Sequence, residues 1–475
     1  MSEYTGDILS AFRPFEEMMR TAGSHPLVIS MFKRNFLQLR SGATGNITRA
    51  QIDPVDAVPD AEELTGYADQ GRDALGRTVV IKLNGGLGTS MGLERTKSLI
   101  PVRDKLRFID IIVRQIEHLR AYSGHPVSLL LMNSEHTRAE TLAALAAYPA
   151  IAGDFPLDFL QHRVPRILAE GFVPVHAAVP PDAAWSPAGH GDIYTALATS
   201  GLLARFLDKG MEYAFISNAD NLGAVLDPEI LGFFAAQRLP FLMEGADRTP
   251  ADRKGGHLAR LKDGRLTLRE SAQCPDDEAE EFQDITRYRY FNTNSLWVNL
   301  GALHALLTRY DNILPLPLIR NQKTLDVRDP DSPTVFQLET AMGAAISLFD
   351  RAAAVRVPRS RFAPVKTTDD LLAIRSDAYI LTDDHRLVPN PARTLPHLDV
   401  TLDRRYYKII SDLDLRFPHG APSLLECASL RIDGDVRFGA GVVCRGDVWL
   451  RADDGAVRTV ADHTILDAHV TRESV

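Results

Sequence analysis

The sequence predicts an α/β protein with a largely parallel sheet, followed by a parallel β-helix. Between residues 77 and 390, apolar β-branched segments alternate with amphipathic segments, as in a sheet covered by helices on both faces. A glycine-rich loop follows the first of these apolar segments, at residues 85–92. Beyond residue 390, glycines and apolar residues recur at roughly six-residue spacing, which is typical of β-helix coils.

The chain divides into three predicted domains. Residues 1–76 form a helical lead-in, with amphipathic stretches around Phe12–Met19 and Val28–Leu39. Residues 77–390 form the central domain and residues 391–475 the β-helix domain. The elements expected in the central domain are strands at 78–83, 127–132, 158–161 and 213–216 and helices at 107–120 and 135–147. Ligands of such sheets bind beyond the carboxyl ends of the strands.

The β-helix prediction rests on residues 432–449, where Ile432, Phe438 and Val443 alternate with glycines. A small antiparallel β appendage is the alternative. Because the segment is short, either form must pack on the central domain or on another subunit. A homo-oligomer that assembles through this domain is therefore a possibility.

Composition excludes several function classes. The net charge of −9 over 475 residues, without a basic run, argues against nucleic-acid binding. Three widely separated cysteines indicate a reducing compartment, and no histidine pattern fits structural zinc. No signal peptide is apparent, and no apolar run approaches the roughly 20 residues that span a membrane. We expect a cytoplasmic protein that does not enter a membrane.

The glycine-rich loop narrows the function most. It reads Leu-Asn-Gly-Gly-Leu-Gly-Thr-Ser-Met-Gly from Leu83 to Gly92. Leu93 stands where a P-loop needs Lys-Ser or Lys-Thr, and Met91 stands where a dinucleotide loop needs its third glycine. The segment is therefore neither of the two standard nucleotide loops. Its backbone N–H groups remain free to close around phosphates or to lie against a base.

This loop, with Lys97-Ser98 after it, resembles that of the eukaryotic-type UDP-glucose pyrophosphorylases, the UTP–glucose-1-phosphate uridylyltransferases. The resemblance continues to the C-terminal coils. It implies a Rossmann-like nucleotidyltransferase (GT-A-like) mixed sheet, a left-handed β-helix, UTP and glucose 1-phosphate as substrates, and Mg²⁺ as cofactor. Leu93-Glu94-Arg95-Thr96 departs from the family's usual Cys-Lys-Gly-Pro, which puts the loop conformation near Lys97 in question. The C-terminal segment is shorter than is usual in the family, which puts the formation of the family's end-to-end oligomers in question.

The resemblance implies which residues bind UTP: Leu83, Asn84, Gly85, Gly86, Met132, Gln161 and Gly189. Gln161 would contact uracil, since a carboxamide offers one donor group and one acceptor to its carbonyl and N3–H. Met132 begins a Met-Asn-Ser segment that corresponds to a uridine-side loop. Ser134 could equally serve only as a helix N-cap.

The implied residues for glucose 1-phosphate are His190, Asn218, Gly256 and Asn294. His190 lies in a Gly-His-Gly-Asp motif, where flanking glycines let the backbone approach a phosphate while imidazole donates to it. We expect Asp192 of this motif to cap the helix that begins at Ile193. Gly256 follows Lys254 and Gly255 in a segment that matches the family's hexose pocket, as does Asn294. Trp297 is expected to be a core residue.

Three residues are predicted to be catalytic: Lys97, Asp220 and Lys366. Asp220 follows the strand at 213–216, and a carboxylate there can hold Mg²⁺ together with substrate phosphates. An Asx-turn is the alternative. Lys366 matches the family's phosphate-clamping lysine, where prokaryotic relatives are expected to have a second aspartate. No base is required, because a phosphate monoester is already largely dianionic at neutral pH.

Two other functions remain open at this point. One is a pyrophosphorylase of the same fold for galactose 1-phosphate or an N-acetylhexosamine 1-phosphate, although N-acetylglucosamine enzymes are expected to carry a Gly-Gly-x-Gly-Thr-Arg loop. The other is a catalytically silent nucleotide-sugar sensor. Lys97, Asp220 and Lys366 are all present, which argues against the sensor.

Overall fold

The computed structural model describes residues 2–93, 95–175, 181–253, 255–326, 329, 331–395 and 398–467. Its helices are α1 Ser2–Thr21, α2 Pro26–Arg40, α3 Ala68–Leu75, α4 Phe108–Ser123, α5 Glu135–Leu145, α6 Ile193–Thr199, α7 Leu202–Asp208, α8 Pro228–Ala236, α9 Ala279–Phe282, α10 Leu300–Arg309, α11 Thr368–Arg375, α12 Arg404–Tyr407 and α13 Ile410–Arg416. Among the described residues, no helix combines the length and apolarity needed to cross a bilayer.

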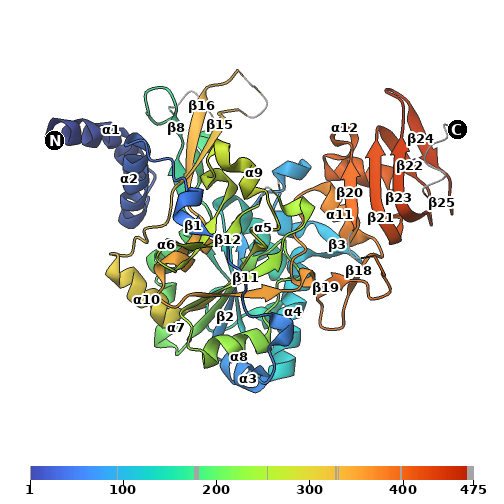
Figure 1. Ribbon diagram of the computed structural model, residues 1–475, viewed down its shortest axis with the longest axis horizontal. Coiled ribbons are helices and arrows are strands. Elements are labelled where there is room, and N and C mark those ends of the chain that lie inside the picture. The colour runs from blue at the N-terminus through green and yellow to red at the C-terminus, as the bar shows by residue number, and fades with distance from the viewer. Residues whose placement is uncertain are drawn as a thin grey trace.

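A large mixed sheet forms the centre of the molecule (Figure 1). Its strands are β1 Ile52–Asp53, β2 Thr78–Asn84, β5 Ser128–Asn133, β6 Asp158–Leu160, β10 Tyr213–Asn218, β11 Phe241–Asp247, β12 His257–Leu261, β13 Leu266–Arg269, β14 Tyr290–Asn299 and β17 Ala353–Val357. The order is β1-β12-β14-β10-β2-β5-β6. Strands β10, β2, β5 and β6 are parallel, whereas β14 runs antiparallel to β10 and β11. The predicted central strands and helices are therefore confirmed, with ends that differ by a few residues.

Helices cover both faces of this sheet because successive side chains of β2 point to opposite sides. Val80 belongs to a core with residues of α3, α4 and α8. Val79 and Ile81 belong to a second core with residues of α6, α7 and α10. Figure 1 shows α3, α4 and α8 at the lower side of the sheet and α6, α7 and α10 at its left.

The N-terminal residues join the sheet in part. Helices α1 and α2 pack on each other through Phe12, Phe15, Phe32 and Phe36, all buried, which confirms both amphipathic stretches. Strand β1 pairs with β12 at one edge of the main sheet, and α3 packs against α8. The proposed boundary at residue 76 thus falls between elements that contribute to one sheet and one core.

The C-terminal strands pair in parallel. Strands β20 Asp399–Leu402, β21 Ser423–Asp433, β23 Val443–Arg451 and β25 Ile465–Leu466 form one sheet, and β22 Asp435–Phe438 pairs with β24 Val457–Val460. The antiparallel alternative is therefore wrong. Ile432 and Phe438 are buried in the same apolar core as Val80 of the main sheet, so this region packs on the central domain.

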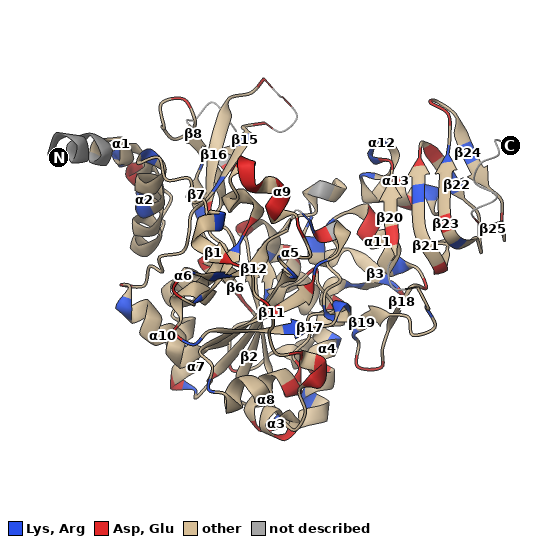
Figure 2. Ribbon diagram, in the orientation of Figure 1, with Lys and Arg blue, Asp and Glu red and all other residues tan. Residues whose placement is uncertain are grey.

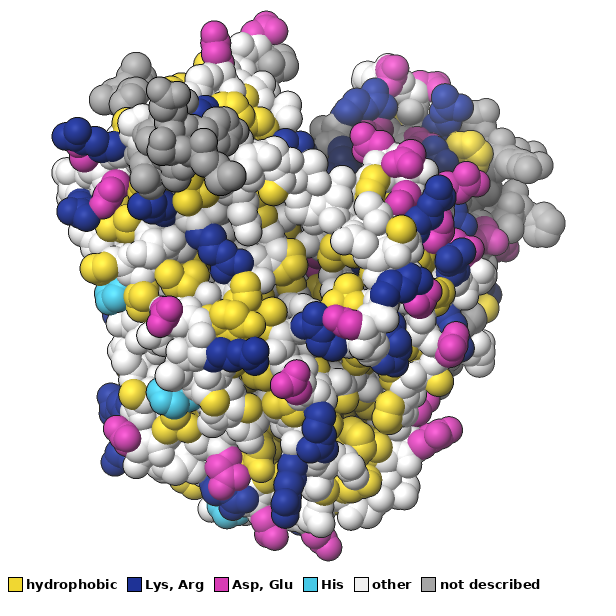
Figure 3. All heavy atoms as spheres, turned by 60° about the vertical axis from the view of Figure 1, so that its left-hand side comes forward, with side chains coloured by type: hydrophobic (Ala, Val, Ile, Leu, Met, Phe, Trp, Pro, Cys, Tyr) yellow, Lys and Arg dark blue, Asp and Glu magenta, His cyan; other side chains and the backbone are white. Residues whose placement is uncertain are grey.

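Short strand pairs complete the fold. They are β3 Pro101–Arg103 with β4 Leu106–Arg107, β7 Arg163–Pro165 with β9 Trp185–Pro187, β15 Ile319–Thr324 and β8 Ile167–Leu168 with β16 Thr334–Glu339, and β18 Tyr379–Leu381 with β19 Leu387–Pro389. Figure 2 marks the positions of charged residues along the ribbon, with adjoining acidic positions at α9, and Figure 3 shows acidic and basic side chains interspersed over the face in view.

Candidate active site

The register of the parallel strands brings their carboxyl ends together. Leu83 of β2 lies beside Asn218 of β10 on one side and Met132 of β5 on the other. Met132 in turn lies beside Phe159 of β6. Gln161 comes two residues later, and its N–H donates to the Asn133 carbonyl at 2.7 Å. Residues far apart in the sequence therefore meet at one edge of the sheet.

A cavity of about 360 Å³ lies at this edge, and we call it the glycine-loop cavity. Most of the predicted site residues line it: Leu83, Asn84, Gly85, Gly86, Lys97, Met132, Gln161, Gly189, His190, Asn218 and Asp220. Leu87, Ser98, Pro187, Ala219 and Glu339 also line it and were not predicted. Gly256, Asn294 and Lys366 are not part of its lining.

The glycine loop folds back on itself and thereby carries Lys97 to this cavity. The N–H of Gly88 donates to the Arg95 carbonyl at 3.1 Å, and the N–H of Lys97 donates to the Gly86 carbonyl at 3.2 Å. The departure from the family spelling therefore leaves the return of the loop intact. Gly92 has a φ of +73°, and a Cβ there would lie 2.1 Å from Ile409 Cγ2. Glycine is required at this position both for conformation and for space.

Lys97 and Asp220 form an ion pair at the cavity wall. Lys97 Nζ lies 2.5 Å from Asp220 Oδ2, and the two side chains are 16% and 20% exposed. Asp220 Oδ1 is buried and has no hydrogen-bond partner among the described residues. A buried carboxylate oxygen without a donor is well suited to a cation, because Mg²⁺ prefers oxygen ligands. The alternative of an Asx-turn does not account for this orphaned oxygen.

Gln161 is held between two backbone segments. Its Nε2 donates to the Gly189 carbonyl at 2.9 Å. A Cβ on Gly85 would lie 2.5 Å from its Oε1, so the absence of a side chain at Gly85 gives the carboxamide its place. One Nε2 hydrogen and the Oε1 lone pairs remain for a ligand. Ser134 is the N-cap of α5, with Thr137 completing a capping box, which confirms the capping role.

The Gly-His-Gly-Asp motif lies against the segment that follows β16. A Cβ on Gly189 or Gly191 would come within 2.6 or 2.4 Å of Thr340 atoms, so both glycines are needed. His190 Nδ1 accepts a hydrogen bond from the Met342 N–H at 3.1 Å. Burial lowers the pKa of His190 to about 4. The imidazole is therefore neutral at pH 7, and its hydrogen is on Nε2.

The expected capping role of Asp192 is wrong. Asp192 occupies the N-cap position of α6, but its side chain makes no capping hydrogen bond. Its carboxylate instead accepts hydrogen bonds from the backbone N–H and ring Nδ1 of His162, at 2.7 and 2.9 Å. His162, on a neighbouring loop, offers the carboxylate two hydrogen-bond donors. The only donors that α6 could offer instead are the backbone N–H groups of its first turn.

The predicted hexose-binding residues lie in a separate group, which we call the asparagine cluster: Gly256, Glu270, Asn292 and Asn294. Asn292 donates from Nδ2 to Asn294 Oδ1 at 2.9 Å, and its N–H donates to the Gly256 carbonyl at 3.1 Å. Asn294 has a φ of 56°, at an irregular register between β11 and β14. Lys254 lies outside the described residues. Trp297 is fully buried, as expected of a core residue.

Lys366 lies between the two groups of residues. The preceding residue, Val365, donates its N–H to the Asp220 carbonyl at 3.2 Å. The Lys366 ammonium acts electrostatically on Glu270: burial raises the pKa of Glu270, and the nearby lysine opposes that rise. Thr367 caps α11 with Asp370 in a capping box. The lysine side chain is exposed and follows the segment that borders Asp220.

Sequence reasoning missed the charged residues beneath the site. Lys82 is buried in β2 and donates to Ser217 Oγ and to the Ala224 carbonyl, at 2.8 and 2.6 Å. Burial, with the nearby Arg361, lowers the pKa of Lys82 to about 7. Arg361 pairs with buried Glu244 at 2.6 Å. The signal that could have revealed Lys82 is a single charged residue within an otherwise uncharged strand.

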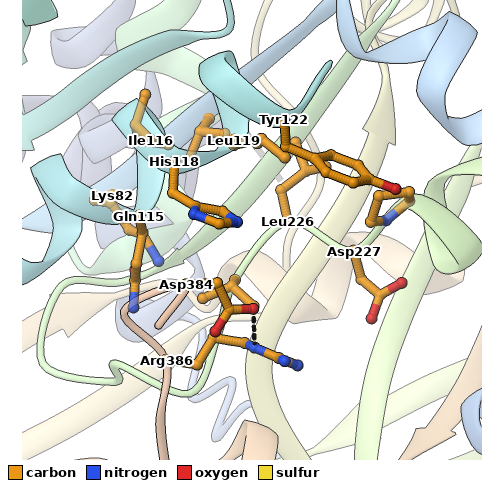
Figure 4. Close-up of a pocket in the computed structure, with 13 residues that line it drawn as sticks. Lys82, Gln115, Ile116, His118, Leu119, Tyr122, Leu226, Asp227, Asp384 and Arg386 are labelled. Carbon is orange, nitrogen blue, oxygen red and sulfur yellow. Dashed lines mark ion pairs between the residues drawn. The ribbon is translucent and has the colours of Figure 1, made fainter. Parts of the chain in front are cut away.

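Lys82 also lines a second cavity, of about 270 Å³, beneath the sheet (Figure 4). Its walls are α4, the segment before α8, and the Asp384–Arg386 ion pair, whose nearest atoms lie 2.6 Å apart. None of the predicted site residues lines it. Within the described part of the chain, no group of three or more His, Cys, Asp or Glu side chains could hold a metal.

Comparisons with known proteins agree with this geometry. Residues 29–445 match the family model described as UTP–glucose-1-phosphate uridylyltransferase. The enzyme of that name from Solanum tuberosum is 42% identical over 394 residues, which is 82% of this chain and 80% of the relative. The one from Hordeum vulgare is 41% identical over 417 residues, 87% and 85% of the two chains.

Solved structures of UDP-glucose pyrophosphorylases also match this chain over nearly its full length. A UDP-glucose pyrophosphorylase from Leishmania major matches with a TM-score of 0.91 and 43% identity, over 97% of this chain and 98% of the other. A variant of the Leishmania protein in complex with UDP-glucose matches with a TM-score of 0.90 and 42% identity, over 96% and 98%.

Proposed function

Because this chain belongs to the family of UTP–glucose-1-phosphate uridylyltransferases, we propose that its glycine-loop cavity transfers a uridylyl group from UTP to glucose 1-phosphate. The products are UDP-glucose and pyrophosphate. The observation that carries the proposal is the Lys97–Asp220 pair, 2.5 Å apart, in the same cavity as Gln161. A cation, a carboxylate and a base-reading amide are the groups that such a transfer needs.

The reaction requires position and charge compensation rather than a nucleophilic side chain. A phosphate oxygen of glucose 1-phosphate attacks the α-phosphorus of UTP, and the bond to the β-phosphate oxygen breaks, so that pyrophosphate leaves with its electron pair. Because the attacking monoester is already largely dianionic, no proton must be removed. The protein would then lower the barrier by in-line alignment and by offsetting the charge on the phosphates.

UTP would lie along the glycine loop. The free Nε2 hydrogen and Oε1 of Gln161 match a uracil carbonyl and N3–H. Gly85 and Gly86 allow close approach of the base and ribose, with Leu83, Asn84, Met132 and Gly189 around them. Lys97 would serve the triphosphate, because its ammonium lies in the same wall as Asp220.

The residues present fit a magnesium ion. Asp220 Oδ1 is buried and unpaired, and one carboxylate plus substrate phosphates is a usual ligand set for Mg²⁺. When bound there, the ion would neutralise charge on the α-phosphate and on the leaving pyrophosphate. Asp220 would hold it, while Lys97 keeps contact with the other carboxylate oxygen.

Lys366 and His190 would serve the attacking sugar phosphate. His190 can donate from Nε2, since its Nδ1 already accepts from Met342. Lys366 would offset charge during transfer, from the segment that borders Asp220. Asn218 lies at the end of β10 and lines the same cavity as His190. Gly256 and Asn294 of the asparagine cluster would receive the hexose hydroxyls.

A pyrophosphate-release assay tests the function. We expect release with UTP and glucose 1-phosphate, and much weaker release when CTP replaces UTP. Galactose 1-phosphate and N-acetylglucosamine 1-phosphate should be poorer acceptors. Faster release with either of these sugars would identify the alternative pyrophosphorylase. Binding of UDP-glucose without any release would identify the sensor.

The C-terminal region is proposed to be a left-handed β-helix through which the enzyme self-associates. The parallel pairing of β20 to β25, with positive φ at Gly434, Gly441 and Gly446, supports coils with tight corners. Free thiols at Cys274, Cys427 and Cys444 support a cytoplasmic, reducing location. Sedimentation analysis of the full chain tests the self-association.

A further inference from the structure

The proposed function gives no role to Asp192, the charged residue that ends the Gly-His-Gly-Asp motif. Its side chain is completely buried, at 0% exposure. A buried carboxylate is costly unless it is hydrogen-bonded. Here both oxygens are engaged by one residue, His162, through the backbone N–H and the ring. His162 directly follows Gln161.

The ring of His162 is fixed from both sides. Nδ1 lies 2.9 and 3.0 Å from the two Asp192 oxygens, and it must carry the hydrogen because a carboxylate only accepts. Nε2 lies 3.1 Å from Thr199 Oγ1, on α6. Asp192 and Thr199 lie at the two ends of that helix. The ring therefore lies along α6 and cannot turn without breaking a contact to it.

The same contacts join the two loops that form the UTP-binding wall. Gln161 donates to the Gly189 carbonyl at 2.9 Å, and Ala188 N–H donates to the His162 carbonyl at 3.2 Å. With the two bonds from His162 to Asp192, residues 161–162 are tied to residues 188–192 at four points. Gln161 and Gly189 line the cavity, whereas His162 and Asp192 are not part of its lining.

We propose that Asp192 is a positioning residue: through His162 it holds the Gln161 carboxamide against Gly189, and so sets the recognition of uracil. This inference rests on the proposed function. Asp192 contacts no substrate, and its effect is on the base-reading loop rather than on the transfer step. Gly189 and His190 share the loop that Asp192 anchors, but His190 is held independently by Met342.

The test uses Asp192→Ala, Asp192→Asn and His162→Ala in the full chain. For Asp192→Ala and His162→Ala we expect the KM for UTP to rise about tenfold, the effect of one misplaced hydrogen bond to a ligand. The kcat and the KM for glucose 1-phosphate should change by less than about twofold. Asp192→Asn keeps an oxygen for the His162 N–H and should restore much of the lost affinity.

Two further measurements separate positioning from general support of the fold. The double variant Asp192→Ala/His162→Ala should be no worse than either single variant, because both break the same link. Discrimination between UTP and CTP should fall in the same variants, since the base-reading amide is then loose. Ser200→Ala is the matched control: this hydroxyl, on the next residue after α6, donates to the Ala196 carbonyl.

Each outcome is decisive. If the unsubstituted chain releases no pyrophosphate from UTP and glucose 1-phosphate, the proposed function fails. If it does so but Asp192→Ala leaves both the KM for UTP and the discrimination against CTP unchanged, the positioning role is wrong. A fall in melting temperature with parallel loss of kcat and of both affinities, not rescued by Asp192→Asn, would also overturn it and show a structural role alone.

Discussion

Replacing Gln161 by Glu changes one side-chain NH₂ group to an oxygen and has two separable effects. In UTP binding, the carboxylate cannot donate to a uracil carbonyl, and a lost hydrogen bond with an unpaired group costs about 1–3 kcal/mol. At about 1.4 kcal/mol per tenfold, the Kd for UTP should rise roughly tenfold to a hundredfold. The bond from Nε2 to the Gly189 carbonyl, at 2.9 Å, is lost as well.

The second loss appears in stability rather than in affinity, because the Gly189 contact exists without ligand. One net hydrogen bond contributes about 1 kcal/mol, so the melting temperature should fall by about 2 °C or less in a chain of this size. Calorimetric titration with UTP measures the first effect, and differential scanning fluorimetry measures the second. Gln70→Glu adds the same charge at an exposed position of α3 and serves as control. A UTP affinity for Gln161→Glu equal to that of the control would remove Gln161 from the uracil site.

Three further predictions concern charge. Asp220→Asn should lower turnover at saturating Mg²⁺ by at least about 100-fold, because the buried oxygen offered to the cation becomes part of a neutral amide; retained turnover would reject the metal site. Lys366→Ala should lower kcat far more than UTP affinity, as expected of a contact that strengthens during transfer; a lower melting temperature with normal kcat would instead show a structural lysine. Burial and nearby Arg248 lower the pKa of His257 to about 3, so between about pH 6.5 and pH 3 the unfolded chain binds the extra proton and stability falls with falling pH. The drop in melting temperature from about pH 7 to about pH 5 should therefore be smaller in His257→Phe, and an equal drop would contradict this origin.

The sequence predicted the strands because these depend on local patterns, whereas the site residues at their ends were implied by the family resemblance. A β-branched run such as Thr78–Ile81 favours a strand that is buried on both faces, and the glycines that follow indicate where the strand ends. Once those strands are parallel, Leu83, Met132 and Asn218 must meet at one edge. The local patterns placed the strand ends side by side, and the resemblance supplied which residues there would bind substrate.

Contacts between distant segments were not predictable in the same way. The position of Asp192 before a helix suggests a cap, and only the fold reveals that His162 lies close enough to take its carboxylate. Glu244 and Arg361 are 117 positions apart and gave no signal of pairing. The parallel pairing in the C-terminal region followed from the spacing of its glycines, whereas its contact with the glycine loop had no signature in the sequence.

That last contact bears on how far the chain can be shortened. Ile409 lies in the C-terminal region, yet it fills the space above Gly92 of the nucleotide loop. Tyr407 lies two residues before Ile409, and its carbonyl accepts a hydrogen bond from Thr368, which begins the helix after Lys366. The segment that leads into α13 thus contacts both the glycine loop, which precedes Lys97, and the start of α11, which follows Lys366. The main sheet is consequently not a separable module, and a shortened chain that keeps both contacts must include the residues between β20 and α13 of the C-terminal region.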